Sequence, residues 1–183
     1  MANIRIATRY AQALISAAEE QKLLDRVAAD METLERIMRD SRDFMLFLRN
    51  PIIKSEKKGS LFSAIFAASL HSVTMGFLQL LTEKGREEVL PDIARKFFAL
   101  RDEKLGIVNV GIRASTELSK EQQKTIQKRF EDITRKTVRL NVSVENELKG
   151  GFLARVGDTV FDGSVKRQLE LLRERFAEGV GVN

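Results

Sequence analysis

The chain has 183 residues, of which 43% are hydrophobic, and it carries a net charge of +5 at neutral pH. This length and composition suffice for one large or two small globular domains with a buried core. There is no cysteine and only one histidine, which excludes disulfides, thiolate metal sites and histidine clusters. We therefore expect neither a metal nor a cofactor. No stretch is apolar for long enough to cross a bilayer, and the N-terminus lacks the features of a signal or transit peptide.

The positive charge is spread along the chain. Residues 1–105 hold 17 Lys and Arg against 15 Asp and Glu, and residues 106–183 hold 14 against 11. Proteins that bind nucleic acid usually concentrate basic charge and interleave aromatic residues for stacking, whereas this chain has no tryptophan and one tyrosine. The composition argues against nucleic acid as a partner, and a helical-bundle adaptor or nucleic-acid-binding regulatory protein is kept as the alternative function.

Residues 1–105 predict a bundle of six helices joined by short connections. Apolar residues recur at helical spacing in each segment, and Pro51, Gly85 and Gly106 follow helix ends. We expect Ser55 and Ser72 to cap the fourth and fifth helices. The six segments are residues 3–20, 24–40, 43–49, a helix that starts at residue 55, residues 72–84 and residues 87–105.

The first and fifth of these helices are more apolar than one packing face requires. On the first, the polar positions form a single narrow stripe, and on the fifth Met75 and Leu78 lie outside the main apolar stripe. One interpretation is that each helix lies in the middle of its own bundle. The other is that each helix packs inward on one side and offers the other side to a partner helix. The residues alone leave both open.

Residues 106–183 predict a smaller unit of mixed α and β structure with a C-terminal helix, so we place the domain boundary near Gly106. The segments 107–114 and 138–144 alternate apolar and polar residues, as strands do. Between them, Ser119 and Gln122 form a capping box before a helix. The expected domains are residues 1–105, a helical bundle, and residues 106–183, an αβ domain with a mixed sheet.

The end of the chain predicts a hairpin followed by a helix. Residues 152–156 and 159–161 can pair around a two-residue loop, Gly157-Asp158. Ser164 can cap a final helix, for which we expect one buried apolar face. That face consists of Val165, Leu169, Leu172 and Phe176.

No motif for catalysis or nucleotide binding occurs: GxGxxG, GxxxxGK[ST], HExxH, CxxC and GxSxG are all missing from the sequence. Asp158 and Asp162 could be taken for an acid-base pair, but both fall in turns that favour aspartate for backbone reasons. His71 precedes a helix and is expected to be a loop or cap residue. We predict that the protein has no catalytic residues, is not an enzyme and binds no small-molecule ligand.

The most concentrated basic surface is a lysine stripe, Lys120, Lys124 and Lys128, on the helix between the first two strands. Such a stripe is usually a solvated helix face. The alternatives are a docking site for an acidic partner helix or for a phosphate backbone, and phosphate binding would show a steep dependence on salt. Basic residues that extend the stripe are Arg129, Arg135, Lys136 and Arg139.

Three motifs near the C-terminus resemble the signature of the δ subunit of F-type ATP synthases, which includes the mitochondrial oligomycin-sensitivity-conferring protein. They are Gly150-Gly151, the R-x-G-D of residues 155–158 and the D-G-S of residues 162–164, followed by an amphipathic helix. The likeness covers nearly the whole chain. It implies a non-catalytic stator subunit of the peripheral stalk, which links the catalytic head to the membrane-embedded proton channel and is required for coupled ATP synthesis.

The resemblance also implies partners and a location. In that family the bundle holds the N-terminal helix of a head α subunit with its first and fifth helices, and the C-terminal part holds the ends of the stalk b subunits. We expect one copy per complex, peripheral to the cytoplasmic side of the bacterial inner membrane, and no nucleic acid. The groove residues expected for the α subunit are Tyr10, Ala11, Leu14, Val73 and Phe77, and the candidates within residues 106–183 for the b subunits are Lys120, Lys124 and Lys128.

Overall fold

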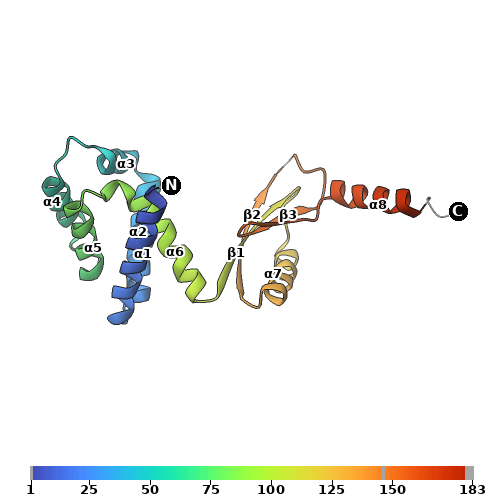
Figure 1. Cartoon of the computed structure of the whole chain (residues 1–183), viewed down its shortest axis with the longest axis horizontal. Helices are drawn as coiled ribbons and strands as arrows, with labels where there is room; N and C mark the ends of the chain where they lie inside the picture. The colour runs from blue at the N-terminus through green and yellow to red at the C-terminus, as the bar shows by residue number, and fades with distance from the viewer. Residues whose placement is uncertain (1, 146, 180–183) are drawn as a thin grey trace. The chain divides into compact units, whose positions relative to one another are not determined.

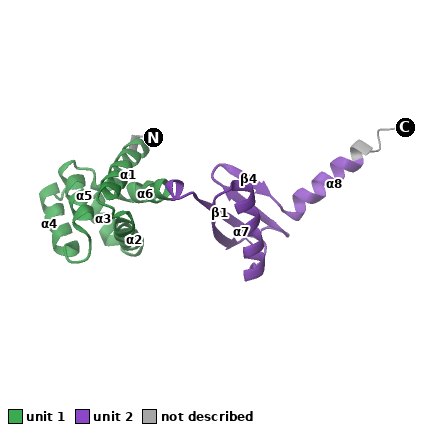
Figure 2. Cartoon of the chain, turned by 90° about the horizontal axis from the view of Figure 1, so that it is seen from below, with its two compact units in different colours: residues 1–101 green, residues 102–183 purple. Residues whose placement is uncertain are grey.

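The structure is a computed structural model that describes residues 2–145 and 147–179, with the backbone alone for residues 2, 3 and 177–179. The chain forms two compact units, residues 1–101 and residues 102–183 (Figure 2). The first unit is helical, and the second combines helices with a four-stranded sheet. The predicted fold class, mainly α with a smaller α+β part, is therefore confirmed.

The first unit contains the six predicted helices, the last of which is preceded by a short 3-10 turn (Figure 1). Pro91 is the second residue of the sixth helix, where its missing N–H has no helical partner to lose. The elements are α1 (Ala2–Glu20), α2 (Leu24–Asp40), α3 (Arg42–Arg49), α4 (Ser55–Phe66), α5 (Ser72–Glu83), η1 (Glu87–Val89) and α6 (Leu90–Lys104).

A continuous apolar core joins all of these elements. Phe44 of α3 meets Phe62 and Phe66 of α4 edge to face, with ring centroids 6.2 and 5.9 Å apart. Burying a large apolar side chain contributes about 1.5–3 kcal/mol each, so this core supplies the main stabilisation of the bundle. It also fixes α1 and α5 against each other, because both contribute to the core.

The predicted serine caps of α4 and α5 are wrong. Ser55 lies inside α4, whose N-cap is Lys54, and this cap makes no side-chain hydrogen bond. The N-cap of α5 is His71, whose Nδ1 accepts from the backbone N–H of Val73 at 3.3 Å. Asp30 of α2 adds to this cap by accepting from the backbone N–H of His71 at 2.8 Å. A residue distant in sequence thus helps to cap α5, which a local pattern cannot reveal.

The second unit is built on a mixed sheet in the order β2-β1-β3-β4. Strands β1 and β2 are parallel and are joined by α7, and the remaining pairs are antiparallel. The capping box at the start of α7 and the hairpin between β3 and β4 are confirmed, with Gly157 at a φ of 58°. The elements are β1 (Ile107–Ala114), α7 (Lys120–Thr134), β2 (Thr137–Val144), β3 (Phe152–Val156), β4 (Thr159–Asp162) and α8 (Val165–Gly179).

The second unit begins inside the last turn of α6, at Asp102, whereas the sequence placed the boundary near Gly106. The carboxylate of Asp102 is buried and accepts from the amide of Asn109 at 2.5 Å. It also lies 3.4 Å from the guanidinium of Arg139. These two bonds attach the end of α6 to β1 and β2, so the C-terminal turn of the helix belongs to the sheet.

The predicted buried face of the last helix is wrong. Ser164 does cap α8, because its Oγ accepts from the backbone N–H of Arg167 at 3.2 Å. However, Leu169 is 54% exposed and Phe176 is 66% exposed. The apolar periodicity was a correct sign of an amphipathic helix, but no described element of the chain covers the apolar side. Figure 1 shows α8 leading away from the sheet.

Candidate functional site

Within residues 2–145 and 147–179, no group of three or more histidine, aspartate or glutamate side chains is placed to hold a metal ion. Asp162, one member of the aspartate pair considered above, closes a turn: its Oδ1 accepts from the backbone N–H of Ser164 at 2.8 Å. Hydrogen bonds from Ser164 lower the pKa of Asp162 below its usual value. Among the described helices, none is both long enough and apolar enough to span a bilayer.

Helices α1 and α5 meet through the aromatic rings of Tyr10 and Phe77, whose centroids lie 6.3 Å apart in an edge-to-face arrangement. Of the five residues expected to border a groove, Tyr10 and Val73 are half-buried, and Phe77 is 7% exposed. Ala11 and Leu14 are buried in the core, at 0% and 2% exposure. The five residues therefore belong to one pair of helices, but three of them are buried: Ala11 and Leu14 have no surface to offer a partner, and Phe77 has little.

Beside Tyr10, α1 presents small and apolar residues at intervals of four, three and four positions, and these are half-buried or exposed. On α5, the flank next to Phe77 carries Leu80, which is 40% exposed, and Gly76, where an added Cβ would meet nothing within 4 Å. We call this surface the α1/α5 strip. It consists of Ile6, Tyr10, Ala13 and Ala17 of α1 and Val73, Gly76, Phe77 and Leu80 of α5.

Sequence reasoning missed Gly76 and Ala13 in this strip. The signal was present, because both small residues lie at helical spacing from the apolar residues that were chosen. A pattern search weighted towards large apolar side chains passes over them. Small exposed residues on an apolar flank allow another helix to approach closely, which large ones prevent.

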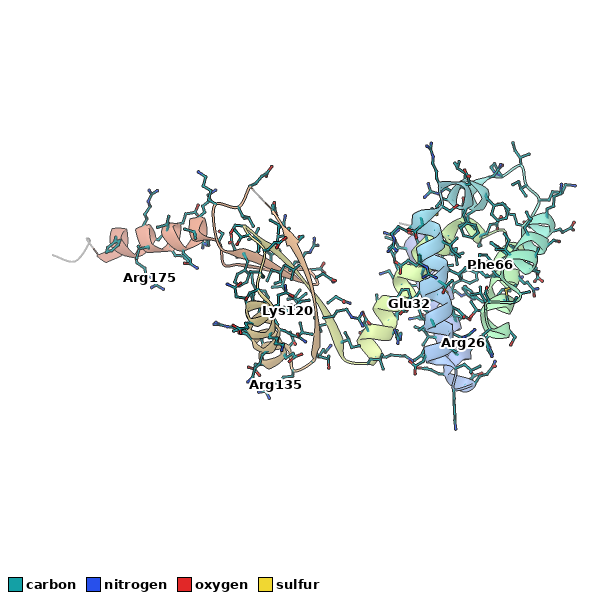
Figure 3. The ribbon with its side chains drawn as sticks, turned by 180° about the vertical axis from the view of Figure 1, so that it is seen from behind. Arg26, Glu32, Phe66, Lys120, Arg135 and Arg175 are labelled. Carbon is teal, nitrogen blue, oxygen red and sulfur yellow. The ribbon has the colours of Figure 1, made fainter. Side chains whose placement is uncertain are left out.

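The buried carboxylate of Asp30 holds α5 in place behind the strip. Asp30 is 3% exposed, and its carboxylate also accepts from the hydroxyl of Thr74 at 2.7 Å. Arg26, labelled in Figure 3, lies 3.5 Å from Asp30 and donates to the backbone oxygen of Ser69 at 3.1 Å. These bonds fix the N-terminal end of α5 to α2, so the spacing of the strip is set by the fold.

A second open surface is the apolar face of α8, defined by the four residues that the sequence predicted to be buried. All are between 43% and 66% exposed: Val165, Leu169, Leu172 and Phe176.

The base of α8 is held by the glycine motifs. The backbone oxygen of Gly150 accepts from the N–H of Val165 at 3.0 Å, and the N–H of Gly163 donates to Phe152 at 2.9 Å. The motifs thus hold the start of α8 against β3, while its apolar face stays open.

The third surface is the flank of α7 that faces β2. Lys120 and Lys124, together with Arg139 of β2, line a cleft of about 460 Å³ whose lining contains no acidic residue. Lys128 is exposed on the same side of the helix but does not line this cleft. Arg135, at the other end of α7 in Figure 3, lines a different cleft that Glu131 and Asp132 share. The uncompensated positive charge is therefore at the N-terminal half of α7.

Comparison with known proteins places nearly the whole chain in one family. The family described as "ATP synthase delta (OSCP) subunit" matches residues 6–176. A protein named ATP synthase subunit delta from Chlorobium phaeovibrioides is 40% identical over 96% of this chain and 97% of its own length. One of the same name from Chlorobium phaeobacteroides is 36% identical over 95% of this chain and 96% of its own length.

A solved structure supports the fold. A chain in the cryo-EM structure of the Toxoplasma gondii mitochondrial ATP synthase hexamer superposes with a TM-score of 0.74 at 24% sequence identity, over 93% of this chain and 97% of that one. The sequence matches cover nearly every residue of the chain. The chain belongs to the ATP synthase delta (OSCP) subunit family.

Proposed function

We propose that this protein is a non-catalytic stator subunit of the peripheral stalk, which holds the catalytic head of the ATP synthase against rotation. The proposal assigns one partner to each unit. The observation that carries it is the presence, in each unit, of an apolar helix surface that no described residue covers. Such surfaces, framed by polar residues, are typical of protein interaction sites.

In the first unit, the α1/α5 strip is the proposed docking site for the N-terminal helix of a head α subunit. An amphipathic helix can lay its apolar face along such a strip. Gly76 gives the partner backbone room to approach, and Leu80 and Val73 provide apolar contacts beside it. Ala11 and Leu14 are buried beneath the strip, so they support it without touching the partner.

In the second unit, the apolar face of α8 is the proposed docking site for the ends of the b subunits. Its four apolar residues recur along one side of a helix whose base is fixed to β3. Covering these residues would remove apolar surface from water at about 25 cal/mol per Å², which is the usual driving force of helix association. Lys120, Lys124 and Lys128 remain candidates for additional contacts with acidic residues of the b subunits.

This arrangement needs affinity and stiffness but no group with a tuned pKa. We propose that the subunit lies at the cytoplasmic face of the bacterial inner membrane, in one copy per complex, and reaches the membrane only through its partners. The buried cap on α5 and the fixed base of α8 both serve this purpose, because a load-bearing connection must not yield at its attachment points.

A titration of the full chain with a peptide of the α-subunit N-terminus tests the first docking site. Gly76→Leu places a side chain into open space, so the fold should tolerate it while the peptide is blocked. We expect an affinity loss of at least about tenfold, or about 1.4 kcal/mol, since a few central contacts carry most of the binding energy of an interface. Ala29→Leu, on the exposed side of α2, is the matched control and should bind normally. Equal affinity of Gly76→Leu and the wild type would contradict the proposal.

A further inference from the structure

The outer edge of β2 is free. Strand β2 is at one end of the sheet, and its only strand partner among the described residues is β1. Thr137 donates its N–H to Gly106, and Glu145 donates to Ala114, so the odd-numbered residues of this strand bond to β1. The backbone groups of the even-numbered residues therefore point away from the sheet.

The start of this outer edge is already occupied by side chains of α7. The backbone N–H of Val138 lies 3.4 Å from the carboxylate of Glu131, and its carbonyl oxygen accepts from the amide of Gln127 at 3.0 Å. Further along, the outward backbone groups of Leu140 and Val142 have no such partner among the described residues. A row of unpaired backbone donors and acceptors is a template for an additional strand.

The positive charge of Lys120 and Lys124 beside the free edge of β2 favours an acidic partner. Lys120 and Lys124 extend from α7 into the cleft that Leu140 and Arg139 line on the strand side. Neither lysine makes an ion pair with any described residue, and no acidic side chain lines the cleft. A second copy of β2 would bring its own lysines to face these, and like charges repel. An extended segment with carboxylates on one side would meet the two positive charges of Lys120 and Lys124, since Arg139 is already paired with Asp102.

We propose that the edge of β2 between Leu140 and Val144 binds an extended, acidic segment of a partner protein by strand addition. The segment forms backbone hydrogen bonds with the even-numbered residues of β2, and its carboxylates contact Lys120 and Lys124. This mode gives affinity through the main chain and specificity through alternate side chains. The proposal uses neither α8 nor the first unit, but it shares Lys120 and Lys124 with the candidate b-subunit contacts described above.

The experiment uses the full chain and a peptide of about eight residues, matching the length of a strand, that alternates threonine with glutamate. Amide hydrogen exchange measured by NMR is the decisive readout. The amides of Leu140 and Val142 should gain protection when the peptide is added, whereas those of Arg139 and Asn141 are already bonded to β1 and should change little. The proposal would be overturned if the amides of even- and odd-numbered residues of β2 gained equal protection from exchange. It would also be overturned if no amide of β2 gained protection at millimolar concentrations of the peptide.

Two controls separate strand addition from general attraction between charges. Lys124→Glu should weaken the binding of the peptide about fivefold, whereas Arg129→Glu makes the same charge change at an exposed residue of α7 that does not line the cleft and should have little effect. A peptide with the same charges but methylated backbone nitrogens should not bind. The proposal would be contradicted if both variants weakened binding equally, or if the methylated peptide bound as tightly as the unmodified one. It would also be contradicted if a short single-stranded oligonucleotide bound at Lys124 as tightly as the peptide.

Discussion

Gly151 lies so close to Gly163 that a Cβ atom on Gly151 would be only 2.3 Å from the carbonyl oxygen of Gly163. The φ of Gly151, 81°, is one that residues with a side chain rarely adopt. The second glycine of the G-G motif and the glycine of the D-G-S motif therefore touch each other. This contact explains why motifs separated by a whole hairpin belong together: between them they fix the point at which α8 leaves the sheet.

Gly151→Ala should strongly destabilise the second unit, because the added methyl group cannot avoid the backbone of residue 163. We expect a loss of about 2–4 kcal/mol in the free energy of unfolding, measured by urea denaturation. Gly111→Ala in β1 is the matched control. Its Cβ would meet nothing within 4 Å, so stability should be unchanged or slightly higher. A Gly151→Ala protein as stable as the control would show that the close approach is not required.

Asp30→Asn should loosen the attachment of α5 to α2. The carboxylate accepts from the N–H of His71 and the hydroxyl of Thr74 in a buried position, and hydrogen bonds to a charged group contribute about 1.5–3 kcal/mol. We expect a loss of that order in thermal or chemical unfolding. Asp25→Asn on the same helix should cost less than about 1 kcal/mol, because the Asp25 side chain is 96% exposed. Similar losses for the two variants would contradict the assigned role.

Lys58 and Glu87 form a buried ion pair, with 2.6 Å between Nζ and Oε1 and side-chain exposures of 3% and 8%. Lys58 also donates to the backbone oxygen of Leu48 at 3.0 Å, so it joins α3, α4 and η1. Glu87→Leu alone leaves a buried charge without its partner and should cost about 3–5 kcal/mol. Adding Lys58→Met should recover part of that loss. A double-mutant cycle checks this, and strictly additive losses would refute the coupling.

The second unit should lose stability in acid when the carboxylate of Asp162 becomes protonated. Hydrogen bonds from Ser164 lower its pKa in the folded protein below the ordinary value of 3.8, so folding favours the ionised form. The stabilisation is fully present above that value and is lost as the pH falls through the lowered pKa. An NMR titration of the Asp162 carboxyl group should give a midpoint below 3.8 in the wild type. Ser164→Ala removes the side-chain hydrogen bond and keeps the backbone one, so the midpoint should be higher, and an unchanged midpoint would rule out a contribution from the Ser164 hydroxyl.

The sequence was sufficient for most of the fold because its signals are local. The capping box of Ser119 and Gln122, the hairpin loop at Gly157 and the glycine that follows α6 each act within a few residues, and each is found where expected. His71 was expected as a loop or cap residue and is the N-cap of α5, but the part that Asp30 plays in this cap could not be predicted, since Asp30 is 41 residues away from His71. Local propensity cannot anticipate a bond that forms only after the bundle has assembled.

The candidate surfaces were predictable only in part, for a related reason. Periodicity identified Tyr10, Leu14 and the apolar side of α8, but it does not distinguish a side chain that the chain buries from one that it leaves for a partner. Leu14 proved to be core, and Leu169 proved to be exposed. For the lysine stripe, only the packing of α7 against β2 shows that Lys120 and Lys124 line a cleft with a free strand edge while Lys128 does not.

The most direct test of the account is whether this protein joins the catalytic head to the stalk through two separate helix surfaces. Purified head, a soluble b-subunit dimer and the full chain should sediment together as one assembly. Gly76→Leu should release only the head, and Leu169→Asp only the b subunits, while the exposed control Gln168→Asp should release neither. Retention of both partners by a protein carrying Gly76→Leu and Leu169→Asp together would contradict the central claim.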